Sequence, residues 1–326
     1  MTKPFIDTFA ELGRRLDGFG TETTSRHIIE EAIAQNGWFT ERDICAAVEA
    51  IRCKMLNRAE LERWIADYTP TTTPADVALI MAGNIPLVGF FDILCVVASG
   101  HRCHLKASSK DAVLTRYIVD LLRDIDPDIA LYDYDPKVHY DMAIATGSDE
   151  ANAYFREHFA ATRSLLRGSR FSVAILDGKE SDDELSALMN DITAYSGMGC
   201  RSVSVVLAPR NTTPRLPKRE AHNPKLRGLI ATQRALRTMQ RLPYHDHGAF
   251  LLIEATEPTH SLATVALCHY STLDDATKWL ADHHDQIQCV VSHIPSIEQR
   301  VAFGKAQQPT LWHYADGIDT MQFLLN

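Results

Sequence analysis

Hydrophobic residues recur at helical spacing through the first part of the chain, with polar residues between them. The pattern predicts helices over residues 7–16, 24–35, 41–54 and 58–68. Thr40 stands before the third of these segments and is followed three positions later by Asp43, which is typical of a helix N-terminus. Residues 69–74 are rich in threonine and proline and predict a linker.

After this linker, the hydrophobic residues gather in short runs separated by amphipathic segments. The runs predict buried strands over residues 77–82, 102–106, 141–145, 171–176, 202–207, 250–254, 263–269 and 288–291. The segments between them predict helices over residues 87–99, 109–123, 149–160, 182–195, 224–242 and 273–284. Strands that alternate with helices form parallel sheets covered by helices, and the chain is longer than one core usually serves. We therefore predict an α/β fold with more than one domain.

The composition narrows the class of protein. Of the 326 residues, 45% are hydrophobic and 23% are charged, which is ordinary for a globular protein. The net charge of −9 disfavours nucleic-acid binding. The first residues lack the apolar core of a signal peptide, and the apolar stretch 81–100 is interrupted by Asn84, Pro86 and Asp92. We expect a cytoplasmic protein without a membrane span, and its seven cysteines, which lack paired spacing, to be reduced thiols.

Cys200 has the most informative surroundings of these cysteines. It stands between a predicted helix and a predicted strand, and Gly197 and Gly199 remove side chains from the approach to its sulfur. A substrate carbonyl and backbone N–H groups can then come close to the thiol. This setting favours a nucleophile over a buried packing residue.

Parallel sheets bind ligands at the carboxyl ends of their strands. Asn84 follows one predicted strand, and its amide could stabilise an oxyanion or could only cap the next helix. Residues 106–110 follow the next strand with two lysines and two serines, which suit a ribose or phosphate but also suit a solvated turn. Thr146, Gly147 and Ser148 precede a helix and suit a dinucleotide phosphate, although they form no complete fingerprint.

Other clusters favour a simpler interpretation. The histidines at 245 and 247 and at 283 and 284 lack further ligands nearby in the sequence, so we expect no metal centre. Cys103 and His104 are adjacent on a predicted strand and point to opposite faces. Basic residues between 215 and 227 could hold the phosphates of coenzyme A or form a solvated charged surface.

Four ordered motifs together resemble the acyl-CoA reductases of the LuxC family, a branch of the aldehyde dehydrogenase superfamily. They are MAGNIPLVGF (81–90), HLKASSKD (104–111), GCRSVS (199–204) and YADGIDT (314–320). The resemblance implies an aldehyde dehydrogenase-like fold, with a Rossmann-type nucleotide-binding domain followed by an α/β catalytic domain and the active site between them. We accordingly divide the chain into an N-terminal helical region (1–70), a nucleotide-binding domain (71–168), a catalytic domain (169–300) and a C-terminal segment that returns to the domain interface (301–326).

The resemblance also implies residue roles. Cys200 resembles the acylated nucleophile, and Asn84 is similar to the amide donor of the oxyanion hole. The positions similar to the family's cofactor-binding residues are Lys106, Ser108, Ser109, Thr146, Gly147, Ser148 and Glu254. Among these, Lys106 corresponds to a contact with the adenosine ribose and Glu254 to a contact with the nicotinamide ribose. We also expect a helix or loop dipole near Cys200, together with Arg201, to lower the pKa of its thiol.

One departure from the superfamily indicates the reaction. Hydrolytic aldehyde dehydrogenases carry a glutamate that activates water, and Leu166 stands at the comparable position here. An acyl-cysteine without a nearby base should survive until it is reduced. The resemblance therefore implies an oxidoreductase that uses NADPH, or NADH, to reduce a coenzyme A or carrier thioester to an aldehyde. An acyl-protein synthetase or an acyl carrier protein is the implied partner, and a homo-oligomer is compatible with the sequence. The alternatives are a carrier subunit that lacks its own reductase activity and an acyl-cysteine hydrolase or transferase.

Overall fold

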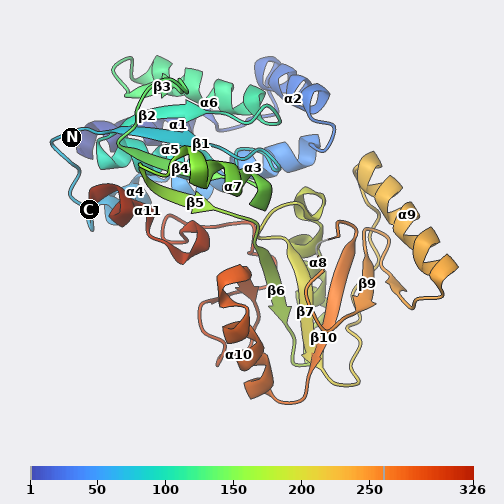
Figure 1. Cartoon of the computed structure of the whole chain (residues 1–326). Coiled ribbons are helices and arrows are strands. Elements are labelled where there is room, and N and C mark those ends of the chain that lie inside the picture. The colour runs from blue at the N-terminus through green and yellow to red at the C-terminus, as the bar shows by residue number, and fades with distance from the viewer. Residues whose placement is uncertain (1, 260) are drawn as a thin grey trace. The chain divides into compact units, whose positions relative to one another are not determined.

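The computed structural model describes residues 2–259 and 261–326, which form two compact units (Figure 1). The first unit contains the residues up to Ser169 together with Pro309–Asn326, and the second contains Arg170–Gln308. The chain thus leaves the first unit after one sheet, builds the second, and returns for its last residues.

The sheet of the first unit is wholly parallel, in the order β3-β2-β1-β4-β5. Its strands are β1 (Asp76–Ile80), β2 (Arg102–Lys106), β3 (Leu131–Asp133), β4 (Met142–Thr146) and β5 (Arg163–Arg167). Helices α5 (Phe90–Ser99), α6 (Ala112–Ile125) and α7 (Asp149–His158) connect them. Since β1 is central and the strand order reverses beside it, the boundary between β1 and β4 is a topological switch point, where such sheets bind ligands.

Four N-terminal helices share the hydrophobic core of this sheet. They are α1 (Thr2–Arg15), α2 (Thr23–Gln35), α3 (Glu41–Met55) and α4 (Arg58–Ile65). Phe9 of α1 meets Phe90 of α5 edge to face, with ring centroids 6.4 Å apart, and both rings are fully buried. Trp64 of α4 is also buried in this cluster. The helical region is therefore part of the first unit.

The C-terminal segment completes the same unit. Helix α11 (Thr320–Leu325) packs against α5. The Tyr314 hydroxyl accepts a hydrogen bond of 2.8 Å from Trp64 Nε1 and lies 2.6 Å from the Tyr68 hydroxyl, which donates to Asp319. These contacts join the end of the chain to the N-terminal helices.

The second unit has a mixed sheet in the order β12-β11-β6-β7-β10-β9-β8. Its strands are β6 (Phe171–Ile175), β7 (Val203–Pro209), β8 (His245–Asp246), β9 (Leu251–Glu254), β10 (Thr264–Tyr270), β11 (Ile287–Val291) and β12 (Arg300–Val301). Every neighbouring pair is parallel except β8 and β9. Its helices are α8 (Asp182–Thr193), α9 (Pro224–Gln240) and α10 (Leu273–Asp282).

The predicted α/β fold with parallel sheets is confirmed. Each predicted helix and strand is present, with ends that differ by a few residues. The short strands β3, β5, β8 and β12 were not predicted. Within the described ranges, no helix is both long enough and apolar enough to cross a membrane.

Candidate active-site residues

Three loops of the first unit meet at the carboxyl edge of its sheet. Ile80, the last residue of β1, pairs with Lys106 on one side and with Ala145 on the other. The turn around Asn84, the loop that begins at Lys106 and the loop that begins at Thr146 therefore leave adjacent strands at the same level. The structure brings these predicted residues together at the topological switch point.

The Asn84 turn packs tightly against the loop after β2. A Cβ atom on Gly83 would lie 2.6 Å from Ser108 Cβ and Oγ, so this position requires glycine. Asn84 itself is exposed. Leu87, three residues on, has a left-handed φ of 54°, and its N–H donates a 2.8 Å hydrogen bond to Asp111 Oδ2. The turn is thus held by a residue from the neighbouring loop.

Asp111 was not predicted as a functional residue, although it ends the second quoted motif. It lies at the start of α6 and is 1% exposed. Burial raises the pKa of its carboxyl to about 7, against the opposing effect of the Leu87 N–H. A short polar residue before a helix usually predicts a cap, and Asp111 makes no side-chain cap here. Its observed contact makes it a positioning residue for the Asn84 turn.

The lysine and serines of the second loop remain accessible. Lys106 and Ser109 are exposed, and Ser108 is half-buried. The Lys106 ammonium lies 6.0 Å from the centroid of the Tyr134 ring. The Ser108 hydroxyl accepts a hydrogen bond of 3.3 Å from Lys110 N–H, which rounds the turn. The Lys106 ammonium is therefore available to a ribose or phosphate.

The third loop opens α7. Ser148 is the N-cap and accepts a 3.3 Å hydrogen bond from Ala151 N–H. A Cβ atom on Gly147 would lie 2.8 Å from Ala151 Cβ, so the backbone there lies directly on the helix. Asp149 and Glu150 occupy the first turn of α7 and oppose an anion at this helix end. The geometry suits a ligand hydroxyl better than a phosphate.

Cys200 lies in the second unit, in a turn between α8 and β7. Tyr195, Ser196 and Gly197 have consecutive left-handed φ values of 51°, 58° and 76°. Two of these residues carry side chains, and both are buried. Such strained backbone persists only where the surrounding structure holds it, and it is common at functional sites. The turn leaves Cys200 half-buried at the amino end of β7.

Hydrogen bonds fix this turn on both sides. Ser172 of β6 donates to the Cys200 carbonyl at 2.8 Å, and the Ser202 N–H donates to the Gly199 carbonyl at 2.8 Å. Helix α8 ends at Thr193, so its carboxyl end leads into the turn. That end of a helix is negative and does not stabilise a thiolate. The predicted helix dipole therefore has the wrong sign for this role, whereas the neighbouring Arg201 carries a positive charge.

A second thiol near Cys200 was not predicted. Burial raises the pKa of Cys289, on β11, to about 11, whereas the neighbouring Arg201 guanidinium lowers it. Charge on Cys200 also affects this pKa, so the two sulfurs lie in one neighbourhood. They are 89 positions apart in sequence numbering, and Cys289 pairs with Ser172 only because β11 and β6 are adjacent. No local pattern could have indicated this.

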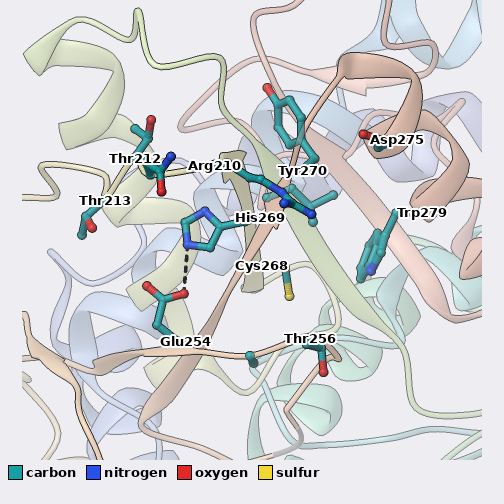
Figure 2. A pocket seen from close by; sticks show the side chains of 13 residues that line it. Arg210, Thr212, Thr213, Glu254, Thr256, Cys268, His269, Tyr270, Asp275 and Trp279 are labelled. Carbon is teal, nitrogen blue, oxygen red and sulfur yellow. Dashed lines mark hydrogen bonds and ion pairs between the residues drawn. The ribbon is translucent and has the colours of Figure 1, made fainter.

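Glu254 lies away from the cysteine turn. Glu254 of β9 pairs in register with Leu267 of β10, which pairs with Val206 of β7. Cys200 lies before the first residue of β7, so it is near the other end of that strand. The Glu254 carboxylate pairs with His269 Nε2 at 2.9 Å, in a cavity at the carboxyl ends of β7, β9 and β10 that Figure 2 shows. The structure does not bring Glu254 and Cys200 together.

The first unit fits the adenosine half of a dinucleotide. It offers a switch point, two glycine positions without room for a side chain, an exposed lysine and an exposed helix N-terminus. An acidic residue also stands at this edge, because Asp133 of β3 pairs in register with Leu105, one residue before Lys106, and its side chain is exposed.

Comparison with known proteins identifies the family of the chain. A family model described as acyl-CoA reductase (LuxC) matches residues 52–216, just over half of the chain. The long-chain acyl-protein thioester reductase of Aliivibrio fischeri is 25% identical over 167 residues, covering 45% of this chain and 35% of that protein. Long-chain acyl-protein thioester reductase 2 of Photobacterium leiognathi is 23% identical over 179 residues, covering 48% and 37%. The matched region therefore spans little more than a third of these relatives.

Solved aldehyde dehydrogenases share the fold. Aldehyde dehydrogenase 21 from Physcomitrella patens aligns with a TM-score of 0.64 at 11% identity, over 92% of this chain and 74% of that one. An aldehyde dehydrogenase from Bacillus cereus, solved as an NAD+ complex, aligns with a TM-score of 0.60 at 14% identity, over 91% and 73%. The predicted aldehyde dehydrogenase-like fold is confirmed.

Proposed function

The chain belongs to the acyl-CoA reductase (LuxC) family, and from this premise we propose that it reduces an acyl thioester to an aldehyde through an acyl-cysteine intermediate. The observation that carries the proposal is the Cys200 turn, in which consecutive left-handed residues and two backbone-directed hydrogen bonds hold a half-buried thiol at a strand end. The curated relatives are named as reductases of long-chain acyl-protein thioesters.

Cys200 acts first as the nucleophile. Its thiolate attacks the carbonyl carbon of the thioester, and the carbonyl oxygen becomes an oxyanion. The Cys200 backbone N–H and the Asn84 side-chain amide donate hydrogen bonds to this oxygen. The carbon–sulfur bond of the substrate then breaks, and coenzyme A or a carrier leaves as a thiol after taking a proton. The acyl group remains on Cys200.

Residues of the first unit bind the cofactor. Lys106, Ser108 and Ser109 would hold the adenosine ribose, and Thr146, Gly147 and Ser148 would face the cofactor from the adjoining loop. When bound, reduced nicotinamide dinucleotide supplies the hydride that reduces the acyl group. Lys106 and Lys110 carry positive charge that favours NADPH over NADH.

Acylation of Cys200 is the step to test. We expect Cys200→Ala to abolish covalent labelling by a radiolabelled long-chain acyl-CoA, measured after denaturing gel electrophoresis. Cys53→Ala is the matched control, because Cys53 is an exposed cysteine of the first unit, and it should label like the wild type. Persistent labelling of the Cys200 variant would contradict the proposal.

The thioester donor follows from the same premise. An acyl-protein synthetase or an acyl carrier protein that presents the acyl group would be the partner, and coenzyme A the small-molecule alternative. A carrier subunit without reductase activity would be acylated at Cys200 in the same way. It would differ in not producing aldehyde when NADPH is added to the acylated protein, so a single-turnover aldehyde assay separates the two.

A further inference from the structure

Three ionisable side chains converge at the carboxyl ends of β6 and β11. Asp177 and Glu180 lie in the loop between β6 and α8, and His293 lies two residues beyond β11. One ligand atom from each lies within 4.8 Å of the others. The Ser292 hydroxyl donates to the Ile175 carbonyl at 2.9 Å, so the two strand ends are tied together beneath the cluster. This cluster is at the opposite end of the sheet from the Cys200 turn.

The histidine is held in the manner of a metal ligand. Its Nε2 lies 3.0 Å from Asp177 Oδ1 and 3.8 Å from Glu180 Oε1. Its other nitrogen, Nδ1, lies 2.8 Å from Glu184 Oε1, on the first turn of α8. Metal-bound histidines usually donate their second ring N–H to a carboxylate, which fixes the ring and directs the other nitrogen to the ion. Glu184 has this position here.

Glu180 has the most deeply buried side chain of the three. Its side chain is only 5% exposed. Oε1 accepts a hydrogen bond of 2.6 Å from the Asp177 N–H, whereas the structure records no partner for Oε2 among the described residues. The basic group recorded beside Glu180 is His293, whose Nε2 lies 3.8 Å from Glu180 Oε1, whereas the Lys179 ammonium is 82% exposed and lies 3.8 Å from Asp177. The Glu180 carboxylate therefore has an oxygen left for a further ligand, and a bound cation would help to offset the cost of burying its charge.

We propose that Asp177, Glu180 and His293 bind one divalent transition-metal ion, with Glu184 orienting His293. One imidazole nitrogen and two carboxylates suit Mn²⁺, Fe²⁺ or Zn²⁺ and lack the thiolates that a soft ion prefers. The ion joins the β6–α8 loop to the segment after β11. Since α8 continues into the turn that carries Cys200, the ion also fixes the start of the helix that positions this turn. The site is separate from the proposed acyl-transfer step.

Mn²⁺ is the probe, because the seven cysteines of the chain would compete for zinc. Titration of the full chain, followed by electron paramagnetic resonance of unbound Mn²⁺, should show one site per chain. Glu180→Gln and His293→Gln should each weaken binding by at least about ten-fold, and Glu184→Gln by about 10- to 100-fold. Asp183→Asn is the matched control, because Asp183 is an exposed carboxylate in the same turn of α8, and it should bind like the wild type.

A second measurement guards against misfolded variants. Mn²⁺ should raise the Tm of the wild type and of Asp183→Asn but not that of Glu180→Gln, whose folding is checked by circular dichroism. Absence of Mn²⁺ binding to the wild type would overturn the proposal. Binding that is unchanged in Glu180→Gln and His293→Gln would place the ion elsewhere and overturn it equally.

Discussion

Asp111 shows how one buried carboxyl can set the geometry of a loop on another strand. Its Oδ2 accepts the N–H of Leu87, a residue whose left-handed φ shapes the Asn84 turn. No positive side chain is paired with Asp111 in the hydrogen bonds and ion pairs that the structure records for it, so burial dominates and raises its pKa to about 7. The position of the proposed oxyanion donor therefore depends on a group that is neutral only below this pH.

The pKa of Asp111 predicts a pH dependence of stability. An aspartate in the unfolded chain has a pKa of about 3.9, so between that pH and about 7 the folded protein retains a proton that the unfolded chain has lost. The contribution of Asp111 to the free energy of unfolding therefore falls as pH rises through this window, by at most about 1.4 kcal/mol per pH unit, and levels off above it.

Asp111→Asn tests this. The amide keeps an acceptor for Leu87 and does not titrate. The difference in unfolding free energy between wild type and variant, from urea titrations at pH 5 to 8, should change in favour of the variant as pH rises. A difference that stays constant across this range would contradict the raised pKa. Asp183→Asn is a control for removing an exposed carboxylate.

Leu166 stands where hydrolytic aldehyde dehydrogenases carry the glutamate that activates water, according to the family resemblance. It is partly buried against an apolar cluster that includes Ile80, Ala145 and Phe159. A glutamate there would have a raised pKa and could accept a proton from water near neutral pH. Leu166→Glu should increase release of fatty acid from acyl-CoA without cofactor, measured by thioester cleavage, whereas Leu166→Gln should not. No increase with glutamate would contradict the role given to Leu166.

At the residue scale, local pattern predicted the candidates that stand at strand ends. Asn84, Lys106 and Ser148 each follow an apolar run, and adjacency of their strands follows from a parallel sheet. Asp111 and Cys289 contact residues that are distant in the sequence, so the spacing of residues along the chain could not predict their roles. Glu254 follows an apolar run as well, but its strand belongs to the second sheet, and only the register shows that it is level with Val206.

At the scale of elements, a buried ion pair joins three parts of the first unit. Arg167 at the end of β5 donates from Nη1 to both Asp92 oxygens at 2.7 Å and from Nη2 to Thr320 Oγ1 at 2.8 Å. The side chains of Arg167 and Asp92 are 4% and 9% exposed. This contact explains the aspartate within the apolar helix α5, and it ties that helix and α11 to the edge of the sheet.

Arg167→Met should destabilise the protein by about 3–5 kcal/mol, because it leaves the Asp92 carboxylate buried without a partner. The measurement is the free energy of unfolding from urea titration. Arg58→Met is the matched control, since the Arg58–Asp7 pair is about half exposed on both sides, and should cost no more than about 1 kcal/mol. Equal effects of the two substitutions would show that the buried pair does not join these elements.

The strands that were not predicted are short or contain few apolar residues. β5 has arginine at both ends, and only Leu165 and Leu166 are apolar within it, so it lacks the run that marks a buried strand. β3, at the opposite edge, buries only Leu131. β8 and β12 are two residues each. Central strands such as β1 and β7 bury nearly every residue and were predicted within a few positions.

At the scale of the whole molecule, the chain divides its proposed chemistry between two units. The predicted cofactor-binding residues that lie together at the sheet edge are in the first unit, and Cys200 is in the second. Each unit has its own hydrophobic core. Cofactor binding can therefore be measured separately from acylation of Cys200. A reductase should show both properties, whereas a carrier subunit should show only acylation.

Hydrogen–deuterium exchange of the full chain, with and without NADPH, tests whether the first unit binds the cofactor. NADPH should slow exchange at the loops that follow β1, β2 and β4, because a dinucleotide at the switch point excludes water from their amides. Cys200→Ala should retain this protection, since the thiol is not a cofactor ligand in our proposal. Lys106→Met should weaken it, because it removes the exposed ammonium beside Tyr134. Exchange unaffected by NADPH at all three loops would instead favour a carrier subunit, in which acylation of Cys200 is not followed by reduction.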